Sequence, residues 1–266
     1  MTSNLATADF HVHSLASHDG GASVLDMCRA GIHAGLTAIG FAEHKDFDPD
    51  DPVVDHFHYD RYAEEIDQGR ELLGDSIEIL MGVEVDYQAW FEEAIRDFLA
   101  DKRFDFVIGS VHYVGRRMVM TDDYVGDRSS DACYAEYFDA VRRSAESGLF
   151  DVIGHPGYAL RRGVPRFGVY DGAGHARSID RMLAAVVASG AALEINTAGI
   201  RQGAGATYPC AEQIARYREL GGTRVVLGSD AHRPEHVAFA FDHAFRMTAG
   251  CDLHSWPGDT GARDRC

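Results

Sequence analysis

The chain has 266 residues, long for one ordinary domain but normal for a single α/β barrel, and 45% of them are hydrophobic, enough for a large core. With 25 Lys and Arg against 42 Asp and Glu, its net charge of −17 argues against nucleic-acid binding and favours a small substrate or a divalent metal. The five cysteines, an odd number without a CxxC pair, exclude a disulfide framework and, without an N-terminal signal, predict a cytoplasmic protein. No apolar run approaches the roughly 18 residues of a membrane span.

Strand-like and helix-like segments alternate along the chain. Short runs rich in Val, Ile and Phe predict buried strands at 8–13, 38–43, 77–85, 104–112, 151–155, 191–197 and 224–230. Helical periodicity between and after them predicts helices at 23–34, 59–73, 90–100, 131–147, 178–189, 209–220 and 234–249. Seven βα units without a linker predict one domain over 1–266, a distorted, parallel (β/α)7 TIM-like barrel. The loops at 45–58 and 157–177 are expected at its mouth, and the polar tail 255–266 is expected to be loose.

The first strand carries the pattern His11-Val12-His13. Side chains two apart in a strand leave the same face, so both imidazoles are expected on one face, with Phe10 and Val12 on the other. His18 follows in a loop that can fold back over the strand end. Three imidazoles so placed indicate the start of a metal site, although the stretch alone also fits a partly exposed strand.

Every predicted strand delivers an imidazole or a carboxylate near its C-terminal end. These strand ends are His11-Val12-His13, Glu43-His44, Glu84-Val85-Asp86, Gly109-Ser110-Val111-His112, Gly154-His155-Pro156, Glu194-Ile195-Asn196 and Ser229-Asp230-Ala231-His232. In a barrel these ends converge on one mouth, where active sites of this architecture lie. A single histidine there is usually structural, but seven strands ending alike indicate a functional site, because unpaired polar groups at a barrel rim are destabilising.

These motifs, in this order, resemble the polymerase-and-histidinol-phosphatase (PHP) superfamily from about Asp9 to His232. The stretches Ser17-His18-Asp19-Gly20 and 194–201, followed by Tyr208-Pro209, resemble its histidinol-phosphate phosphatase branch in particular. The resemblance implies a distorted seven-stranded barrel that holds three divalent metals.

Carried over residue by residue, the resemblance implies nine metal ligands. The first metal would be held by His11, His13, Glu84 and Asp230, the second by Glu84, His112 and His155, and the third by His18, His44 and His232. A mixed set of imidazoles and carboxylates suits Zn, Fe or Mn. Glu43 is expected to orient a ligand histidine rather than to bind metal itself.

The implied activity is that of a phosphomonoesterase acting on L-histidinol phosphate, a step of histidine biosynthesis. Two metals that share Glu84 would lower the pKa of a bridging water and so provide a hydroxide nucleophile. Loop arginines are expected to grip the phosphate, Arg201 after the sixth strand and Arg161 or Arg162 after the fifth. An acid near His232 or a metal-bound water would protonate the leaving group. The candidate catalytic residues are therefore Glu84, Asp230, His232, Arg201 and Arg161.

Three alternatives remain open at this point. The chain could be a PHP phosphoesterase acting on nucleotides or other small phosphate esters, or a metal-binding regulatory module without turnover. The complete ligand set disfavours the second of these. A metal-dependent amidohydrolase would need a carboxylated lysine, which Lys45 or Lys102 would have to supply.

Overall fold

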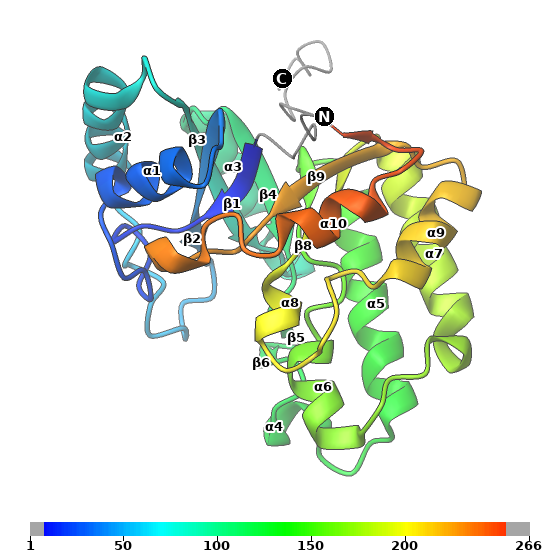
Figure 1. The fold of residues 1–266 in the computed structure, drawn as a ribbon. Coiled ribbons are helices and arrows are strands. Elements are labelled where there is room, and N and C mark those ends of the chain that lie inside the picture. Colours follow the sequence, from blue (N-terminus) through cyan, green and yellow to red (C-terminus); the bar gives the residue numbers. More distant parts are fainter. Residues whose placement is uncertain (1–7, 254–266) are drawn as a thin grey trace.

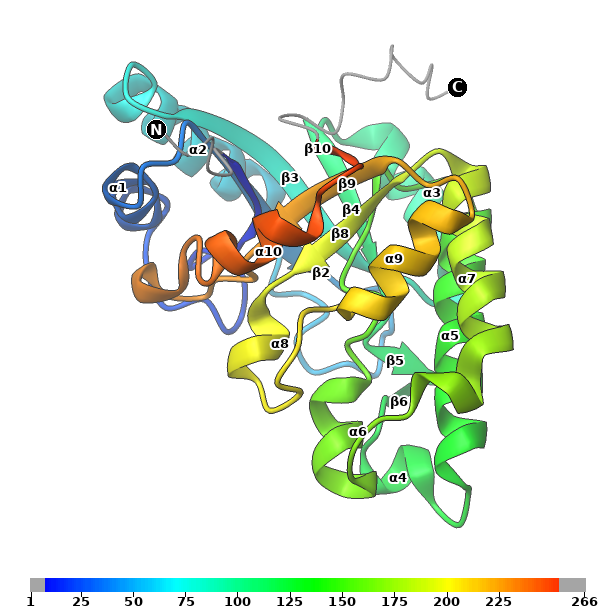
Figure 2. The ribbon, with the colours of Figure 1, turned by 45° about the vertical axis from the view of Figure 1, so that its right-hand side comes forward.

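A computed structural model of the chain describes residues 8–253. At its centre is a sheet of eight strands, all neighbouring pairs parallel, that curls into a distorted TIM-like barrel (Figures 1 and 2). In sheet order the strands are β1 (Ala8–Val12), β2 (Ala38–Lys45), β3 (Glu78–Asp86), β4 (Phe106–Ser110), β7 (Val152–Ile153), β8 (Ala192–Asn196), β9 (Arg224–Gly228) and β10 (Asp252–Leu253). The first seven are the predicted strands, and β10 is an addition, so the predicted parallel α/β barrel is confirmed.

The barrel closes only at the C-terminal ends of its strands. There Val12 bridges Ala231 in parallel, and the His13 backbone N–H donates to the Ala231 carbonyl at 2.8 Å. At the opposite end the start of β9 pairs with β10 instead. The one closed end is therefore the end that carries the polar strand termini.

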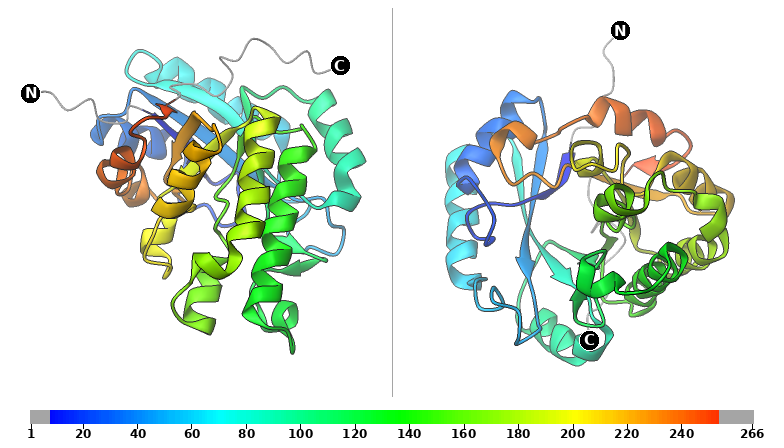
Figure 3. Two further views of the ribbon diagram at one scale, coloured as in Figure 1. Left: turned by 90° about the vertical axis from the view of Figure 1, so that its right-hand side faces the viewer. Right: turned by 90° about the horizontal axis from the view of Figure 1, so that it is seen from below.

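Helices cover the outside of the curled sheet. Seen from the side of the strands' C-terminal ends (Figure 3, right), α1 and α2 lie on one side and α5 and α7 on the other. The longer helices are α1 (Val24–His33), α2 (Tyr59–Leu73), α3 (Glu92–Asp101), α5 (Ser130–Glu146), α7 (Ala176–Ser189) and α9 (Ala211–Glu219). They match six of the seven predicted helices. Ser23 and Ser129 start α1 and α5 by accepting a backbone N–H with their side chains, as helix-capping residues do.

The predicted helix at 234–249 is interrupted. The structure has a 3₁₀ turn, η3 (Pro234–His236), and a separate helix, α10 (Phe241–Met247). Between them Ala238 and Ala240 adopt left-handed backbone conformations, both with φ of 55°. The buried Asp9 side chain accepts the Ala238 N–H at 3.0 Å, so a contact with the first strand takes the place of a helical hydrogen bond.

Seven short elements lie mostly in segments predicted as loops or strand-to-helix connections. The 157–177 segment contains α6 (Leu160–Phe167) and η2 (Gly172–His175), and η1 (Ala89–Phe91) precedes α3. A hairpin of β5 (Tyr113–Val114) and β6 (Arg117–Met118) follows the fourth barrel strand, and α4 (Asp122–Val125) comes next. The short helix α8 (Ala198–Arg201) follows β8. The loop at 46–58, the β5–β6 hairpin, α6 and α8 contribute residues to the mouth.

The barrel interior is filled by aromatic packing. The Phe106 ring lies against Gly40 of β2 and Gly82 of β3, where any β-carbon would lie within 3 Å of the ring. Its edge contacts Phe10 at a centroid distance of 6.0 Å. Phe10 belongs to this inner cluster, whereas Val12 packs in the outer layer, because β1 is irregular between Asp9 and Val12. The prediction that Phe10 and Val12 share one face is therefore wrong.

Within residues 8–253 the cysteines Cys28, Cys133, Cys210 and Cys251 are free thiols. No helix in that range is both long and apolar enough to span a bilayer. The predicted loose tail, 255–266, and Cys266 lie outside the described residues.

Candidate metal centre

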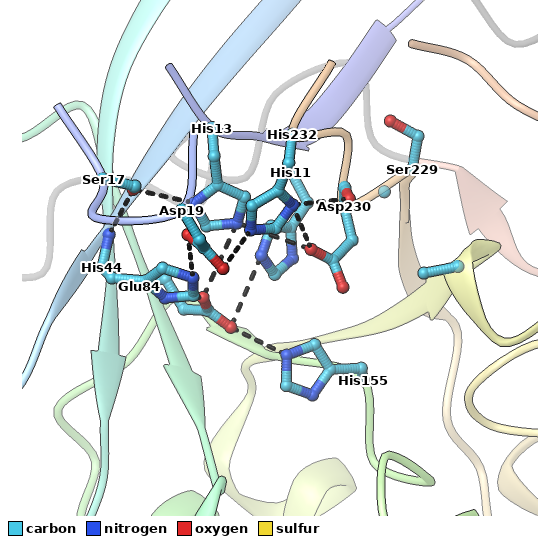
Figure 4. A network of polar contacts seen from close by, with 12 residues as sticks. His11, His13, Ser17, Asp19, His44, Glu84, His155, Ser229, Asp230 and His232 are labelled. Atoms are coloured by element: carbon cyan, nitrogen blue, oxygen red, sulfur yellow. Dashed lines mark hydrogen bonds and ion pairs between the residues drawn. The ribbon is translucent and has the colours of Figure 1, made fainter. Parts of the chain in front are cut away.

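The strand ends bring most of the predicted histidines and carboxylates into one cluster, a large part of which Figure 4 shows. Glu84, at the end of β3, lies at its centre and is almost completely buried. Its carboxylate is surrounded by imidazoles at O–N distances of 2.7 Å (His155 Nε2), 2.8 Å (His44 Nδ1), 3.4 Å (His11 Nε2), 3.7 Å (His13 Nε2) and 3.7 Å (His112 Nε2). One carboxylate therefore contacts imidazoles delivered by several strands.

Three triads of donor atoms within the cluster could each hold a metal ion. Every triad has its donor atoms within 4.8 Å of one another: His11, Glu84 and His155; His11, His13 and Asp230; His13, His44 and His232. The first triad has His11 where His112 was expected beside Glu84 and His155, and the second contains three of the four ligands expected for the first metal. The third differs, because His13 takes the place expected for His18, whose imidazole lies at the edge, 5.3 Å from the His44 ring.

The donor atoms fit a divalent cation. The buried Nε2 atoms of His11, His13 and His232 have no hydrogen-bond partner. Two ligand atoms at roughly 2.0–2.1 Å from a tetrahedral metal are about 3.3–3.4 Å apart, which is longer than a normal hydrogen bond. The separations of 3.4 Å between His11 Nε2 and Glu84 Oε1 and of 3.6 Å between His13 Nε2 and Asp230 Oδ1 agree with that spacing.

The charges of the cluster are also those of a cation site. Burial opposes ionisation of Glu84, but the imidazoles of His11, His112 and His44 around it hold its pKa well below the usual value. Burial likewise opposes protonation of His44, yet Glu84 raises the pKa of His44 to about 9. In His13, burial and the neighbouring His232 and His44 lower the pKa well below its usual value. A bound cation would take the place of the protons on these imidazoles, since metal ligands must be deprotonated.

A carboxylate that was not identified as a site residue from the sequence supports two of these histidines. Glu194 of β8 accepts from His11 Nδ1 at 2.7 Å and from the His155 backbone N–H at 2.5 Å. Asn196 Nδ2 donates to the same carboxylate at 3.0 Å. A hydrogen bond at Nδ1 directs the other ring nitrogen, Nε2, toward the cluster. Two sequence signals pointed to Glu194, namely its position at the end of a predicted strand and its place in the 194–201 stretch that resembles the histidinol-phosphate phosphatase branch.

Glu43 contacts a histidine of the cluster indirectly, through the hydroxyl group of Ser17. Its carboxylate accepts from the Ser17 hydroxyl at 2.5 Å and from the Ser14 backbone N–H at 3.0 Å. The Ser17 hydroxyl in turn lies 3.1 Å from His13 Nδ1. Glu43 is not one of the donors in the three triads, and its position matches the orienting role expected for it.

A second unanticipated carboxylate, Asp19, lies on the loop after β1. It is 3.2 Å from His232 Nε2, 3.5 Å from His44 Nε2 and 4.0 Å from His18 Nε2. Burial opposes its ionisation, but the surrounding imidazoles hold the pKa of Asp19 well below its usual value. In the sequence, the signal for Asp19 was that it directly follows His18, an expected metal ligand.

A cavity of about 580 Å³ opens over the cluster. Arg161, Arg162 and Arg201 all line it, as expected for loop arginines at the mouth. Arg161 and Arg162 both donate to the Tyr158 hydroxyl, at 3.2 and 3.4 Å. Tyr158, which the sequence did not single out, thereby connects this pair to His112, whose ring lies 4.8 Å away.

Arg201 is partly engaged by the backbone of the β9 end. Its two terminal nitrogens donate to the Ser229 carbonyl at 2.8 Å and to the Asp230 carbonyl at 2.5 Å. The side chain is thus held in place beside Asp230, a donor of one triad, while it lines the cavity. Each terminal nitrogen carries a second N–H, so the guanidinium keeps donors for another partner.

The two lysines that an amidohydrolase would need lie elsewhere. Lys45 Nζ donates to the Val54 carbonyl at 3.3 Å, and Lys102 pairs with Asp101 at 3.0 Å. Neither is among the residues that line the cavity. The positions of these two side chains therefore argue against an amidohydrolase.

The chain is similar to known phosphatases over most of its length. It is 32% identical over 246 residues to a probable histidinol-phosphatase of Deinococcus radiodurans, covering 90% of this chain and 91% of that protein. It is 29% identical over 235 residues to the histidinol-phosphatase of Lactococcus lactis, covering 84% and 83%. A crystal structure of the Lactococcus lactis histidinol phosphate phosphatase with zinc, L-histidinol and phosphate superposes with a TM-score of 0.85 at 26% identity, covering 94% and 96%.

The family model described as the PHP domain matches residues 9–198, which contain seven of the nine expected ligands. The remaining two, Asp230 and His232, follow β9 and join the same cluster. With the barrel, the buried cluster and these similarities, the chain belongs to the PHP family.

Proposed function

We propose that this protein is a metal-dependent phosphomonoesterase that hydrolyses L-histidinol phosphate to L-histidinol and phosphate. One observation carries the proposal: donors suited to several divalent cations and three arginines border the same cavity. Metal-type donors alone would fit many hydrolases. The added guanidinium groups match a phosphate, which they bind through paired, charge-assisted hydrogen bonds.

Different residues are proposed to bind the metals, to bind the phosphate and to orient the metal ligands. We propose that the nine expected ligands hold three divalent metals, which when bound supply Lewis acidity that neutralises phosphoryl charge and lowers the pKa of bound water. Arg201 and Arg161 bind and orient the phosphate. Glu194 and Glu43 keep ligand imidazoles in the required orientation.

The same cavity has a side suited to a cation. Asp46 and Asp51, from the loop after β2, line it together with Tyr113. Burial and the nearby Asp86 raise the pKa of Asp46 to about 6, which indicates a crowded negative environment. L-Histidinol phosphate carries a phosphate and an ammonium group. The arginines of the cavity would bind the phosphate, and the aspartates would bind the ammonium group. The Lactococcus lactis relative was crystallised with L-histidinol and phosphate, which supports this assignment.

The test is phosphate release from a panel of monoesters by protein supplied with Zn²⁺, Mn²⁺ or Fe²⁺. The panel contains L-histidinol phosphate, a nucleoside monophosphate, glycerol phosphate and p-nitrophenyl phosphate. The proposal predicts the highest kcat/KM for L-histidinol phosphate and loss of activity on chelation. A higher kcat/KM for the nucleotide would identify the other PHP phosphoesterase activity, and no release from any ester would contradict a phosphatase.

A further inference from the structure

The three histidines expected to hold the third metal share one carboxylate. Asp19 lies within 4.0 Å of His18, His44 and His232, and in each case the nearest imidazole atom is Nε2. Figure 4 shows its carboxylate pointing at His44 and His232. The PHP pattern carried over from the sequence gives this metal only the three imidazoles.

The distances are those between ligands of one metal rather than those of good hydrogen bonds. Asp19 lies 3.2 Å from His232 Nε2, yet that nitrogen makes no hydrogen bond of normal geometry. The separation from His44 Nε2 is 3.5 Å. Both values bracket the roughly 3.3–3.4 Å between ligand atoms of a tetrahedral site. The separation between His18 Nε2 and the Asp19 carboxylate is longer, at 4.0 Å. His18 is also the most exposed of the three histidines.

The loop that carries Asp19 is built to hold it there. Ser17 N–H donates to the Ser14 carbonyl at 3.0 Å, and Gly20 N–H donates to the Ser17 carbonyl at 3.2 Å. Gly21 N–H donates to the His232 carbonyl at 2.8 Å, which ties the loop to one of the histidines. A β-carbon on Gly20 would collide with the Ser14 carbonyl, so the backbone passes too close for any other residue. These contacts fix the backbone of the loop, and with it the point from which the Asp19 side chain extends.

We infer that Asp19 is a fourth protein ligand of the third metal, beside His18, His44 and His232. The inference rests on the proposed metal centre and deepens it. Three imidazoles and one carboxylate make a complete tetrahedral set, which is the composition of a closed zinc site. The carboxylate also offsets one of the two positive charges of the ion, which the neutral imidazoles leave uncompensated.

Zinc binding to the metal-free protein tests the inference. Zn²⁺ affinities are measured by competition with a chromophoric chelator for the parent, Asp19→Asn and Asp19→Glu. Asn keeps the size but not the charge, so one of the three sites should weaken by at least roughly tenfold, since even partners of ligands contribute 10–100-fold in affinity. Glu keeps a carboxylate and should restore that site to within tenfold of the parent.

Asp26→Asn is the matched control. Asp26 lies on the surface with a side-chain exposure of 52%, close to the 46% of Asp19, and its partner is Arg29 rather than a histidine. All three sites should keep parental affinity in this variant. The absorption of Co²⁺ bound at the weakened site gives a second readout, because loss of an oxygen ligand changes its visible spectrum.

The outcomes separate this inference from the proposed function. If Asp19→Asn kept three sites, each with a Zn²⁺ affinity within tenfold of the parent, Asp19 would not be a ligand. An equal loss of Zn²⁺ affinity at all three sites would also overturn the inference. So would a parent protein that binds fewer than three Zn²⁺ ions. A parent that binds three Zn²⁺ but releases no phosphate from L-histidinol phosphate would contradict the proposed function alone. Circular dichroism of each variant verifies that the barrel is folded.

Discussion

Donors on the barrel strands and donors on the loop after β1 are held in different ways. His11 and Glu84 are 0% and 1% exposed, and each has neighbours on other strands. The side chains of His18 and Asp19 are 34% and 46% exposed and contact chiefly other polar groups of the mouth. The strand-borne donors are fixed by the sheet, whereas the loop-borne donors are fixed by a few turns.

This difference in burial goes with a difference in how many metal sites each donor is expected to affect. Among the strand-borne donors, His11 and His13 each take part in two triads, so we expect their loss to affect more than one site. The loop-borne donors, His18 and Asp19, are closer to solvent and are proposed to serve one site only. Variants in the two regions should therefore differ in how many metals they lose.

Replacement of the central carboxylate should have the largest effect. Glu84→Ala removes the group that five imidazoles surround and leaves them with like-charge repulsion and no shared anion. We expect loss of at least two metals and a fall in kcat of roughly a thousandfold or more, comparable with the loss of a catalytic group. Metal analysis and phosphate release measure the two effects. Retention of all metals with near-parental turnover would show that Glu84 is not shared.

Replacement of the supporting carboxylate on β8 should come next. Glu194→Gln keeps the shape of the side chain, but one oxygen cannot accept from both His11 Nδ1 and the His155 N–H. We expect a 10–100-fold loss of metal affinity or turnover, as found for partners of metal-binding histidines. Glu78→Gln, at the exposed start of β3, is the control and should match the parent. An equal response of the two variants would contradict an orienting role for Glu194.

Removal of a cavity arginine should affect substrate more than metal. Arg201→Ala is expected to raise KM, lower kcat and leave the metal content unchanged. A charge-assisted hydrogen bond contributes about 1.5–3 kcal/mol, so kcat/KM should fall by at least roughly tenfold. Arg201→Lys should recover only part, because an ammonium lacks the planar fork. Inhibition by inorganic phosphate should weaken by a factor similar to the KM change; if it did not, Arg161 or Arg162 would hold the phosphate.

A histidine outside the cluster should have the smallest effect. His243 lies exposed on α10 and takes no part in the triads. His243→Ala should leave turnover within about twofold and stability within about 0.5 kcal/mol, as for most surface substitutions. Steady-state kinetics and thermal unfolding measure both. A loss comparable with that of Glu84→Ala would contradict the assignment of ligands by strand position.

The sequence predicted which strand-borne side chains gather at the strand ends, because strand patterns are local and barrel topology brings those ends together. Residues such as His112 and His155 follow short apolar runs, and parallel strands bring their C-terminal ends together. The seven strands and most of the long helices were predicted for the same reason. The exception at β1 arises from a bulge, which alternation of residue types does not show.

The rest depended on contacts between distant parts of the chain. Glu194 supports His11 across 183 residues, and Asp9 breaks the helix at 234–249 by bonding to Ala238 across 229 residues. Such pairs leave no local pattern in one sequence. The role inferred for Asp19 depends on a loop conformation in which Gly20 lies against Ser14, which composition alone does not reveal.

The most direct test of the proposed centre is anomalous X-ray scattering at the zinc edge from crystals of the protein reconstituted with Zn²⁺. The account predicts three anomalous peaks at the strand ends. One should lie among His11, His13, Glu84 and Asp230, a second among Glu84, His112 and His155, and a third among His18, Asp19, His44 and His232. A single peak, or no peak among these residues, would contradict a centre of three metals.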